Sequence, residues 1–186
     1  QVLLLDEDFS DALCDSCQEQ VNAPMACDNF GWHAVGSFGD VVTGYYVGQM
    51  SNNTLSGYDC GQTSASVSFP TVTLPNNADS CQLSFDYYAD LDAVDDGSCT
   101  NDILEVMISV DGQAPTLADG DPCAANTGSS NPLGANANPT SKTLTYDLSQ
   151  LIGSTITVSL DWSSNAQNNV GLCIVIANVR ISCTTP

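Results

Sequence analysis

Short runs of alternating apolar and polar residues, or of β-branched residues, follow one another along most of the chain. They predict strands over residues 2–9, 31–38, 45–50, 64–74, 82–89, 104–110, 143–148, 156–162 and 172–181. Clusters of Gly, Asn, Asp and Pro stand between these runs and favour turns. No segment keeps its apolar residues at the spacing of an amphipathic helix. The pattern therefore predicts an all-β protein.

Two of these strands differ in how we expect them to be buried. Residues 104–110 place apolar side chains at every second position, with Glu105, Met107 and Ser109 between them. This period of two is typical of an antiparallel strand with one buried face. Residues 172–181 are apolar at successive positions, as expected for a central strand that is buried on both faces.

A chain of 186 residues can bury one substantial core, and we expect residues 1–186 to form a single domain. Strands of this length and number fit two packed sheets with Greek-key connections. The predicted fold class is an all-β, two-sheet antiparallel β-sandwich of jelly-roll type, stabilised by disulfides. Residues 14–30 and 113–140 are expected to be long cysteine-containing loops, because their many small polar residues can bury little apolar surface.

Nine cysteines point to an oxidising compartment, where disulfides persist: Cys14, Cys17, Cys27, Cys60, Cys81, Cys99, Cys123, Cys173 and Cys183. A zinc site around Cys14 and Cys17 would lack a second Cys-x-x-Cys pair, and the chain holds one His. Cys99 and Cys123, on either side of the 104–110 strand, are a candidate disulfide pair. The odd count leaves one cysteine free, paired between chains, or paired with a region outside this sequence.

The cysteines predict an extracellular or cell-surface protein. Gln1 opens directly into an apolar strand and is interpreted as a mature terminus left after removal of a signal peptide. No apolar run is long enough for a transmembrane helix, so membrane insertion is not expected. Asn52 begins an Asn-Asn-Thr sequon and is a candidate N-glycosylation site.

Charge narrows the range of partners. The chain has 22 acidic residues against two basic ones, Lys142 and Arg180, and its formal net charge is -20. A phosphate-binding surface needs several cations, so nucleic acid and anionic membranes are excluded as partners. The excess negative charge repels itself, and bound or condensed cations relieve that repulsion. Calcium (Ca2+) is therefore a natural structural cofactor, against the alternative that the acidic residues only form a soluble surface.

The densest group of carboxylates precedes Gly97 and consists of Asp86, Asp90, Asp92, Asp95 and Asp96. Calcium takes six to eight oxygen ligands from a segment that can wrap around it, and Asp-x-Asp spacing that ends in Asp-Gly supplies such a turn. The spacing is not that of an EF-hand. Two interpretations stay open, a structural calcium site and a solvated acidic loop.

Three stretches resemble the jelly-roll modules of secreted and surface proteins, namely MAM domains and bacterial cleaved-adhesin domains of the choice-of-anchor type. The first stretch is residues 5–9, with the sequence LDEDF, followed by Gly31-Trp32. The second is residues 81–88, with the sequence CQLSFDYY. The third combines residues 146–153, 156–161 and 176–181. The likeness spans nearly the whole chain and implies the fold rather than a function.

In such modules an acidic residue of the first strand and an acidic pair of the last strand often share a structural calcium. The resemblance carries these roles to Glu7 and Asn178. Ala177 stands where an Asp is usual, so this chain lacks one ligand of the implied site.

Catalytic motifs of jelly-roll enzymes are missing from the sequence. The Glu-x-Asp-x-x-Glu strand of the jelly-roll glucanases is absent, and none of Glu7, Glu19 and Glu105 pairs with an Asp in a recognisable catalytic strand. Two basic residues and the single His33 cannot supply the cations that a polysaccharide lyase needs. No Gly-x-Ser-x-Gly motif occurs. We therefore expect a non-catalytic protein.

Aromatic residues are candidate platforms for sugar rings, which stack on them in carbohydrate-binding jelly rolls. Tyr45, Tyr46 and Tyr88 are the candidate ligand-binding residues. The alternative is that tyrosines belong to the core, since successive strand residues such as Tyr87 and Tyr88 face opposite sides. Trp162 continues the apolar face of its strand and is expected in the core.

Two functions from different classes follow. The first is a structural or adhesive surface protein whose copies associate into a filament or matrix, with the apolar strand Gln1–Leu5 pairing with a neighbouring sheet edge. The second is a calcium-stabilised carbohydrate-binding module of a secreted hydrolase or adhesin. The odd cysteine favours the first and the tyrosines favour the second. Self-association or other surface proteins are the expected partners, with carbohydrate as the alternative.

Overall fold

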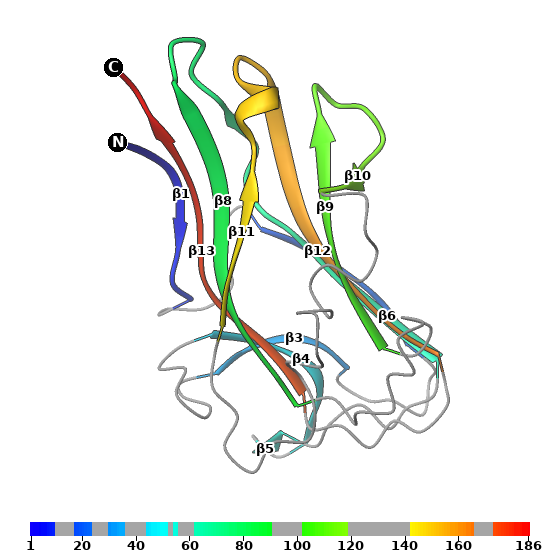
Figure 1. Cartoon of the computed structure of the whole chain (residues 1–186). Helices are drawn as coiled ribbons and strands as arrows, with labels where there is room; N and C mark the ends of the chain where they lie inside the picture. Colours follow the sequence, from blue (N-terminus) through cyan, green and yellow to red (C-terminus); the bar gives the residue numbers. More distant parts are fainter. Residues whose placement is uncertain are drawn as a thin grey trace.

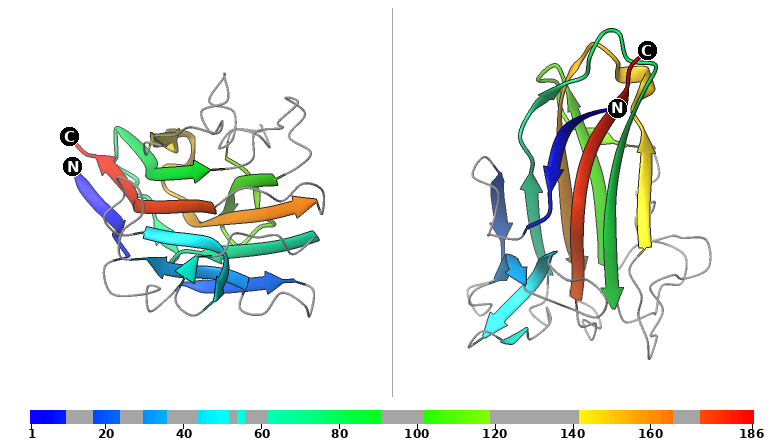
Figure 2. Two further views of the ribbon diagram at one scale, coloured as in Figure 1. Left: turned by 90° about the horizontal axis from the view of Figure 1, so that it is seen from below. Right: turned by 90° about the vertical axis from the view of Figure 1, so that its left-hand side faces the viewer.

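The computed structural model describes residues 1–9, 17–23, 30–35, 44–51, 54–55, 62–90, 102–118, 142–165 and 173–186. These residues form two antiparallel sheets that pack face to face (Figure 1), and Figure 2 shows the two layers from other sides. The only helix of the described chain is the short 3-10 helix η1 (Ser149–Leu151), and no helix there is long and apolar enough to cross a membrane. The predicted fold class is confirmed.

The seven-stranded sheet is built around the longest strand, β13. Its main path runs β11 (Lys142–Asp147), β8 (Ser80–Asp90), β13 (Cys173–Thr184), β4 (Gly44–Ser51) and β3 (Phe30–Val35). Two further strands join it, β1 (Val2–Glu7) on β13 and β5 (Thr54–Leu55) on β4. β13 has partners on both edges, and its successive residues Ile176 and Ala177 are both buried. The prediction of a central strand that is buried on both faces is confirmed.

The six-stranded sheet runs in the order β10 (Thr116–Leu117), β9 (Asp102–Val110), β12 (Thr155–Asn165), β6 (Gln62–Ser68) and β2 (Gln18–Asn22). A further strand, β7 (Val72–Thr73), also pairs with β12. The sequence predicts one strand over 64–74, but the structure divides it into β6 and β7. Pro70 lies in the interruption, and it has no backbone N–H to donate to a ladder.

The core lies between the two sheets and follows the period of two. β9 contributes the buried side chains of Leu104, Val106 and Ile108. β12 contributes those of Ile156, Val158, Leu160 and Trp162. The predicted core position of Trp162 is confirmed. The residues between these point to the other face of the sheet, and except for Met107 they are polar.

Two strands lie where the sequence predicts loops. β2 falls within the predicted loop 14–30, and β10 falls within the predicted loop 113–140, so both loop predictions are wrong at these residues. Every residue of β2 is exposed. Backbone pairing with β6 holds this strand, rather than burial. Its sequence therefore carries no apolar alternation that would reveal it.

A side chain of β2 also ties this strand to the opposite sheet. The backbone N–H of Trp32 on β3 donates a hydrogen bond of 2.6 Å to Oε1 of Glu19 on β2. Gly31 makes this approach possible, because a Cβ atom at that position would lie 2.5 Å from the same oxygen and 3.2 Å from Cγ2 of Val21. Glu19 thus joins an edge of one sheet to an edge of the other.

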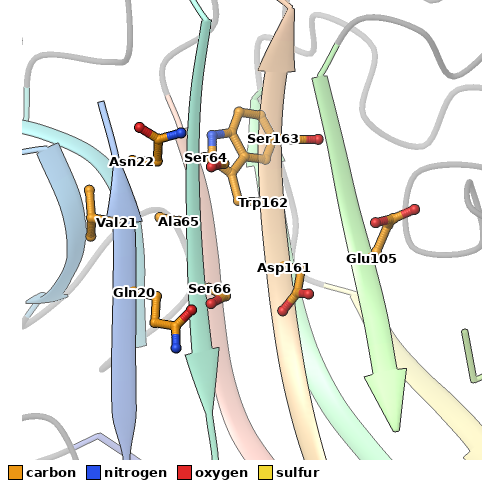
Figure 3. A pocket seen from close by; sticks show the side chains of 10 residues that line it. All are labelled: Gln20, Val21, Asn22, Ser64, Ala65, Ser66, Glu105, Asp161, Trp162 and Ser163. Atoms are coloured by element: carbon orange, nitrogen blue, oxygen red, sulfur yellow. The ribbon is translucent and has the colours of Figure 1, made fainter. Parts of the chain in front are cut away.

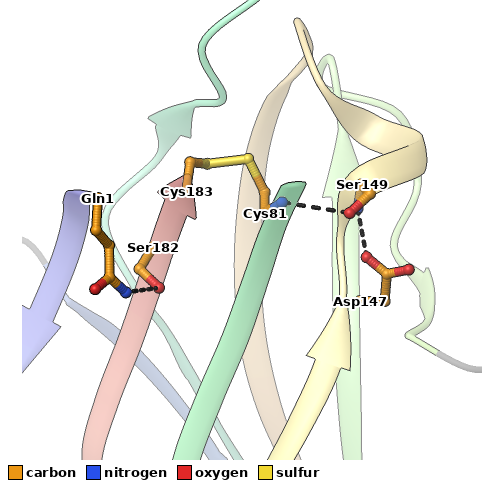
Figure 4. The surroundings of a disulfide bond; sticks show 6 residues. All are labelled: Gln1, Cys81, Asp147, Ser149, Ser182 and Cys183. Carbon is orange, nitrogen blue, oxygen red and sulfur yellow. Dashed lines mark hydrogen bonds between the residues drawn. A yellow bond between two sulfur atoms is a disulfide. The ribbon is translucent and has the colours of Figure 1, made fainter. Parts of the chain in front are cut away.

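The N-terminal strand pairs within its own chain, antiparallel to β13. Nε of Arg180 on β13 donates a hydrogen bond to Oδ1 of Asp6 on β1 at 2.7 Å, which forms an ion pair. Nε2 of Gln1 donates another to Oγ of Ser182 (Figure 4). β1 thus pairs along one edge with its own chain, and among the described residues no strand pairs with its other edge. The expected pairing of Gln1–Leu5 with a neighbouring molecule stays a prediction.

A disulfide joins the two central strands of the seven-stranded sheet. Cys81 on β8 and Cys183 on β13 stand opposite each other in register, with Cα atoms 4.1 Å apart (Figure 4). Both are buried. Cys17 is also disulfide-bonded, and Cys173 is the first residue of β13. The other predicted disulfide cysteines lie outside the described residues: Cys14, Cys27, Cys60, Cys99 and Cys123.

Removing this disulfide is expected to destabilise the fold. The double substitution Cys81→Ser and Cys183→Ser should lower the free energy of unfolding by about 2–4 kcal/mol, because the bond links residues with a sequence separation of 102. Urea unfolding of the variant and the wild type measures the difference. An unchanged free energy of unfolding would contradict a stabilising role for the bond.

Gly31→Ala is expected to lower the free energy of unfolding by about 1–3 kcal/mol, because the added methyl group displaces Glu19 and breaks its hydrogen bond with the Trp32 N–H. Chemical unfolding of Gly31→Ala, Glu19→Ala and the double variant checks this. Both single substitutions break the same bond, so the double variant should be less destabilised than the sum of the two. Additive losses would show that the two residues act independently.

Candidate functional site

The structure brings together part of the predicted calcium set. Asp86 accepts hydrogen bonds from Oγ1 of Thr143 and, at 2.8 Å, from Nδ2 of Asn178. Asn178 lies at an irregularity of β13 with a φ of 52°, a left-handed conformation in which Asn is enriched. Glu7 on β1 accepts a 2.8 Å hydrogen bond at Oε1 from the N–H of Phe9. Calcium binding by Glu7, Asp86 and Asn178 stays a prediction.

The other members of the predicted set are only partly described. Asp90 is the last residue of β8. Asp92, Asp95 and Asp96 lie outside the described residues, as does the candidate glycosylation site Asn52. Within the described part of the chain, no group of three or more His, Cys, Asp or Glu residues is placed to hold a metal ion.

Backbone register places the tyrosines that the sequence predicts to bind sugar. Tyr46 on β4 and Tyr88 on β8 both stand opposite Val175 of β13, so they occupy one row across three strands. Tyr45 stands opposite Ile176, which is fully buried, and belongs to the alternate row. Sugar binding by these three tyrosines stays a prediction.

A different set of residues forms an open groove of about 340 Å³ on the outer face of the six-stranded sheet (Figure 3). Strands β2, β6, β12 and β9 contribute to it. Its lining residues are Gln20, Val21, Asn22, Ser64, Ala65, Ser66, Glu105, Asp161, Trp162 and Ser163. The side chains of Ala65 and Trp162 are buried in the core. The exposed lining therefore combines the polar side chains with the exposed side chain of Val21.

The polar side chains of the groove stand in register across the strands. One row consists of Glu105 on β9, Asp161 on β12, Ser66 on β6 and Gln20 on β2. A second row beside it consists of Ser163, Ser64 and Asn22. Residues that are directly opposite each other in an antiparallel sheet share a face. The first row is thus continuous across four strands, as Figure 3 shows.

Two carboxyl groups adjoin at one end of the first row. Burial raises the pKa of Asp161, and a hydrogen bond with the Ser159 side chain opposes this shift without cancelling it. Burial, and then the charge of Asp161, raise the pKa of Glu105. Oδ1 of Asp161 is buried and accepts no hydrogen bond from the described residues. Glu105 and Asp161 therefore form an acidic end of the groove, where burial disfavours the ionised form of both side chains.

The pairing of Glu105 with Asp161 cannot be read from the linear sequence, because the two residues lie on strands that only the sheet brings together. The one local signal is that each of the two residues stands between apolar neighbours in a strand with alternating side chains. Gln20 is missed for another reason, since β2 itself is not predicted.

In the first row, the carboxylates of Glu105 and Asp161 accept hydrogen bonds, and the hydroxyl of Ser66 and the amide of Gln20 both donate and accept them. A ligand rich in hydroxyl groups can therefore bond to each member.

Asp161→Asn is expected to stabilise the protein, and to do so more at higher pH. The folded protein keeps a proton on Asp161 at pH values where the unfolded chain has released it, so this residue lowers stability as the pH rises above the ordinary pKa of an aspartate. Asparagine removes that loss. Urea unfolding at about pH 4 and about pH 8 should show the larger gain at the higher pH. An equal gain at both, or the same gain in the exposed-site variant Asp79→Asn, would contradict this assignment.

No protein-family model matches the sequence, and no curated protein matches it. Solved structures resemble the chain in fold. The K1 cleaved adhesin domain of Lys-gingipain from Porphyromonas gingivalis W83 shares 14% sequence identity, with 98% of each chain covered and a TM-score of 0.54. CBM27-1 of Caldicellulosiruptor saccharolyticus, solved in complex with mannohexaose, shares 12% identity, with 97% of each chain covered and a TM-score of 0.52. These likenesses show the fold, and the first agrees with the resemblance to cleaved-adhesin modules.

Proposed function

We propose that the protein is a non-catalytic extracellular domain that binds carbohydrate in the groove of the six-stranded sheet. The observation that carries this proposal is the continuous row of Glu105, Asp161, Ser66 and Gln20. Neighbouring strands are about 4.8 Å apart, a spacing close to the length of one sugar ring in an extended glycan. The row therefore offers one polar side chain to each successive sugar of a chain that lies across the strands.

The chemistry of the row matches that of sugar hydroxyls, which both donate and accept hydrogen bonds. The carboxylates of Glu105 and Asp161 accept from them, and a hydrogen bond to an ionised acceptor is about twice as strong as one between neutral groups. Burial raises the pKa of Asp161 because it disfavours the ionised carboxylate. A sugar hydroxyl that donates a hydrogen bond to this carboxylate would stabilise the ionised form. Glycan binding would thus compensate a destabilising feature of the free protein.

Two structures of similar fold support this class of function. CBM27-1 was solved in complex with mannohexaose, and the gingipain domain is a cleaved adhesin domain. A glycan-binding domain at a cell surface would serve adhesion as well. The buried disulfide between Cys81 and Cys183 supports an oxidising, extracellular location.

Self-association has less in its favour. The strand expected to mediate it, β1, pairs with β13 of its own chain. Val2 and Leu3 on this strand are exposed, at 39% and 50%. A second copy would, however, bring a further net charge of -20 close to the first. The groove is therefore the stronger basis for a function.

Blocking the groove tests the proposal. Affinity gel electrophoresis and calorimetry measure binding of glucomannan, mixed-linkage β-glucan and xylan by the wild type and two variants. Ser66→Phe places a ring in the middle of the row and is expected to weaken binding at least about tenfold, which is about 1.4 kcal/mol. Ser84→Phe is the matched control and should leave binding unchanged, because Ser84 is a half-buried serine on β8 of the other sheet.

Three outcomes would contradict the proposal at different points. Equal binding by the wild type and Ser66→Phe would remove the groove as the site. Absence of binding to every glycan tested would overturn the carbohydrate function. Release of new reducing ends from a bound glycan by the wild type would show hydrolysis and contradict the non-catalytic assignment.

A further inference from the structure

The basic residues of the chain all lie on the sheet opposite the groove. The sequence contains two Lys or Arg residues and one His. Lys142 begins β11, Arg180 lies on β13 and His33 lies on β3. These three strands belong to the seven-stranded sheet. The strands of the six-stranded sheet therefore carry no basic residue, and the groove that they form is lined by acidic and neutral residues alone.

Anionic sugars need a cation where they bind. A carboxylate or sulfate group that leaves water without a partner loses much of its solvation, and proteins usually supply Arg or Lys to such groups. Arg180 is already engaged with Asp6 at 2.7 Å. In the groove, an anionic sugar would instead face Glu105 and Asp161, which stand directly opposite each other. Like charges at this range disfavour binding.

Neutral sugars meet the opposite situation, because their hydroxyls donate to the same carboxylates. Resting on the proposed function, we propose that the groove selects uncharged, extended glycans and excludes glycans that carry uronate or sulfate groups. The pair of Glu105 and Asp161 is the specificity determinant. The pair both accepts from the hydroxyls of a neutral chain and repels an anionic one, so one structural feature sets affinity and selectivity together.

The test compares two forms of one glycan. The neutral glycan that binds best among glucomannan, mixed-linkage β-glucan and xylan is compared as its uncharged hydroxyethyl ether and its carboxymethyl ether at a matched degree of substitution, so that the two forms differ mainly in charge. For the wild type, we expect the carboxymethylated form to bind at least about tenfold more weakly at low salt, and the difference to shrink at high salt because screening shortens the range of the repulsion.

Variants of the pair separate its effect from that of the whole protein. Glu105→Gln combined with Asp161→Asn should weaken binding of the neutral form and bring the ratio of the two affinities close to one. Glu105→Gln alone should shift the ratio in the same direction. The control, Asp8→Asn combined with Asp79→Asn, removes the same charge from exposed sites outside the groove and should leave the ratio unchanged. Thermal unfolding confirms that each variant is folded.

Failure of this inference is distinguishable from failure of the proposed function. Wild-type protein that binds both forms equally well would overturn the selectivity and leave carbohydrate binding intact. A ratio that falls equally in the control variant would assign the exclusion to the net charge of -20 instead of the pair. Wild-type protein that binds no neutral glycan would overturn the proposed function itself.

Discussion

The groove and the core depend on one strand, β12, whose side chains alternate between them. Leu160 and Trp162 are buried against the opposite sheet, and Asp161 between them faces the groove. The same alternation places Ser163 in the groove beyond Trp162. Because the side-chain period of a strand is two, a slip by one residue would move the polar set into the core. Packing of the apolar side chains in the core therefore fixes which residues of β12 face the groove.

Pairing extends that constraint from β12 to the edge of the sheet. β9 and β6 lie on either side of β12 and add Glu105 and Ser66 to the row. β2 lies beyond β6 and is exposed along its whole length, so burial contributes little to its position. The hydrogen bond from the Trp32 N–H to Glu19 holds it to the other sheet. The row reaches Gln20 because the two sheets are joined at this edge.

Charge is distributed unequally between the two sheets. On the seven-stranded sheet, Asp6 is paired with Arg180 and Asp86 accepts hydrogen bonds from two side chains. In the groove, burial raises the pKa values of Asp161 and Glu105. Carboxylates held in this state lower the stability of the free protein. The core between the two sheets and the buried disulfide offset this loss.

Elements with a local signal can be predicted from the sequence: the alternation at 104–110, the central strand at 172–181, the core position of Trp162 and the presence of disulfides. The strand Gln18–Asn22 and the pairing of Glu105 with Asp161 become visible only in the folded chain. The physical reason is that apolar periodicity records the burial of each residue itself. Strand pairing between distant segments is made by backbone hydrogen bonds, which every residue type except proline can form, so it leaves little trace in the side chains that it brings together.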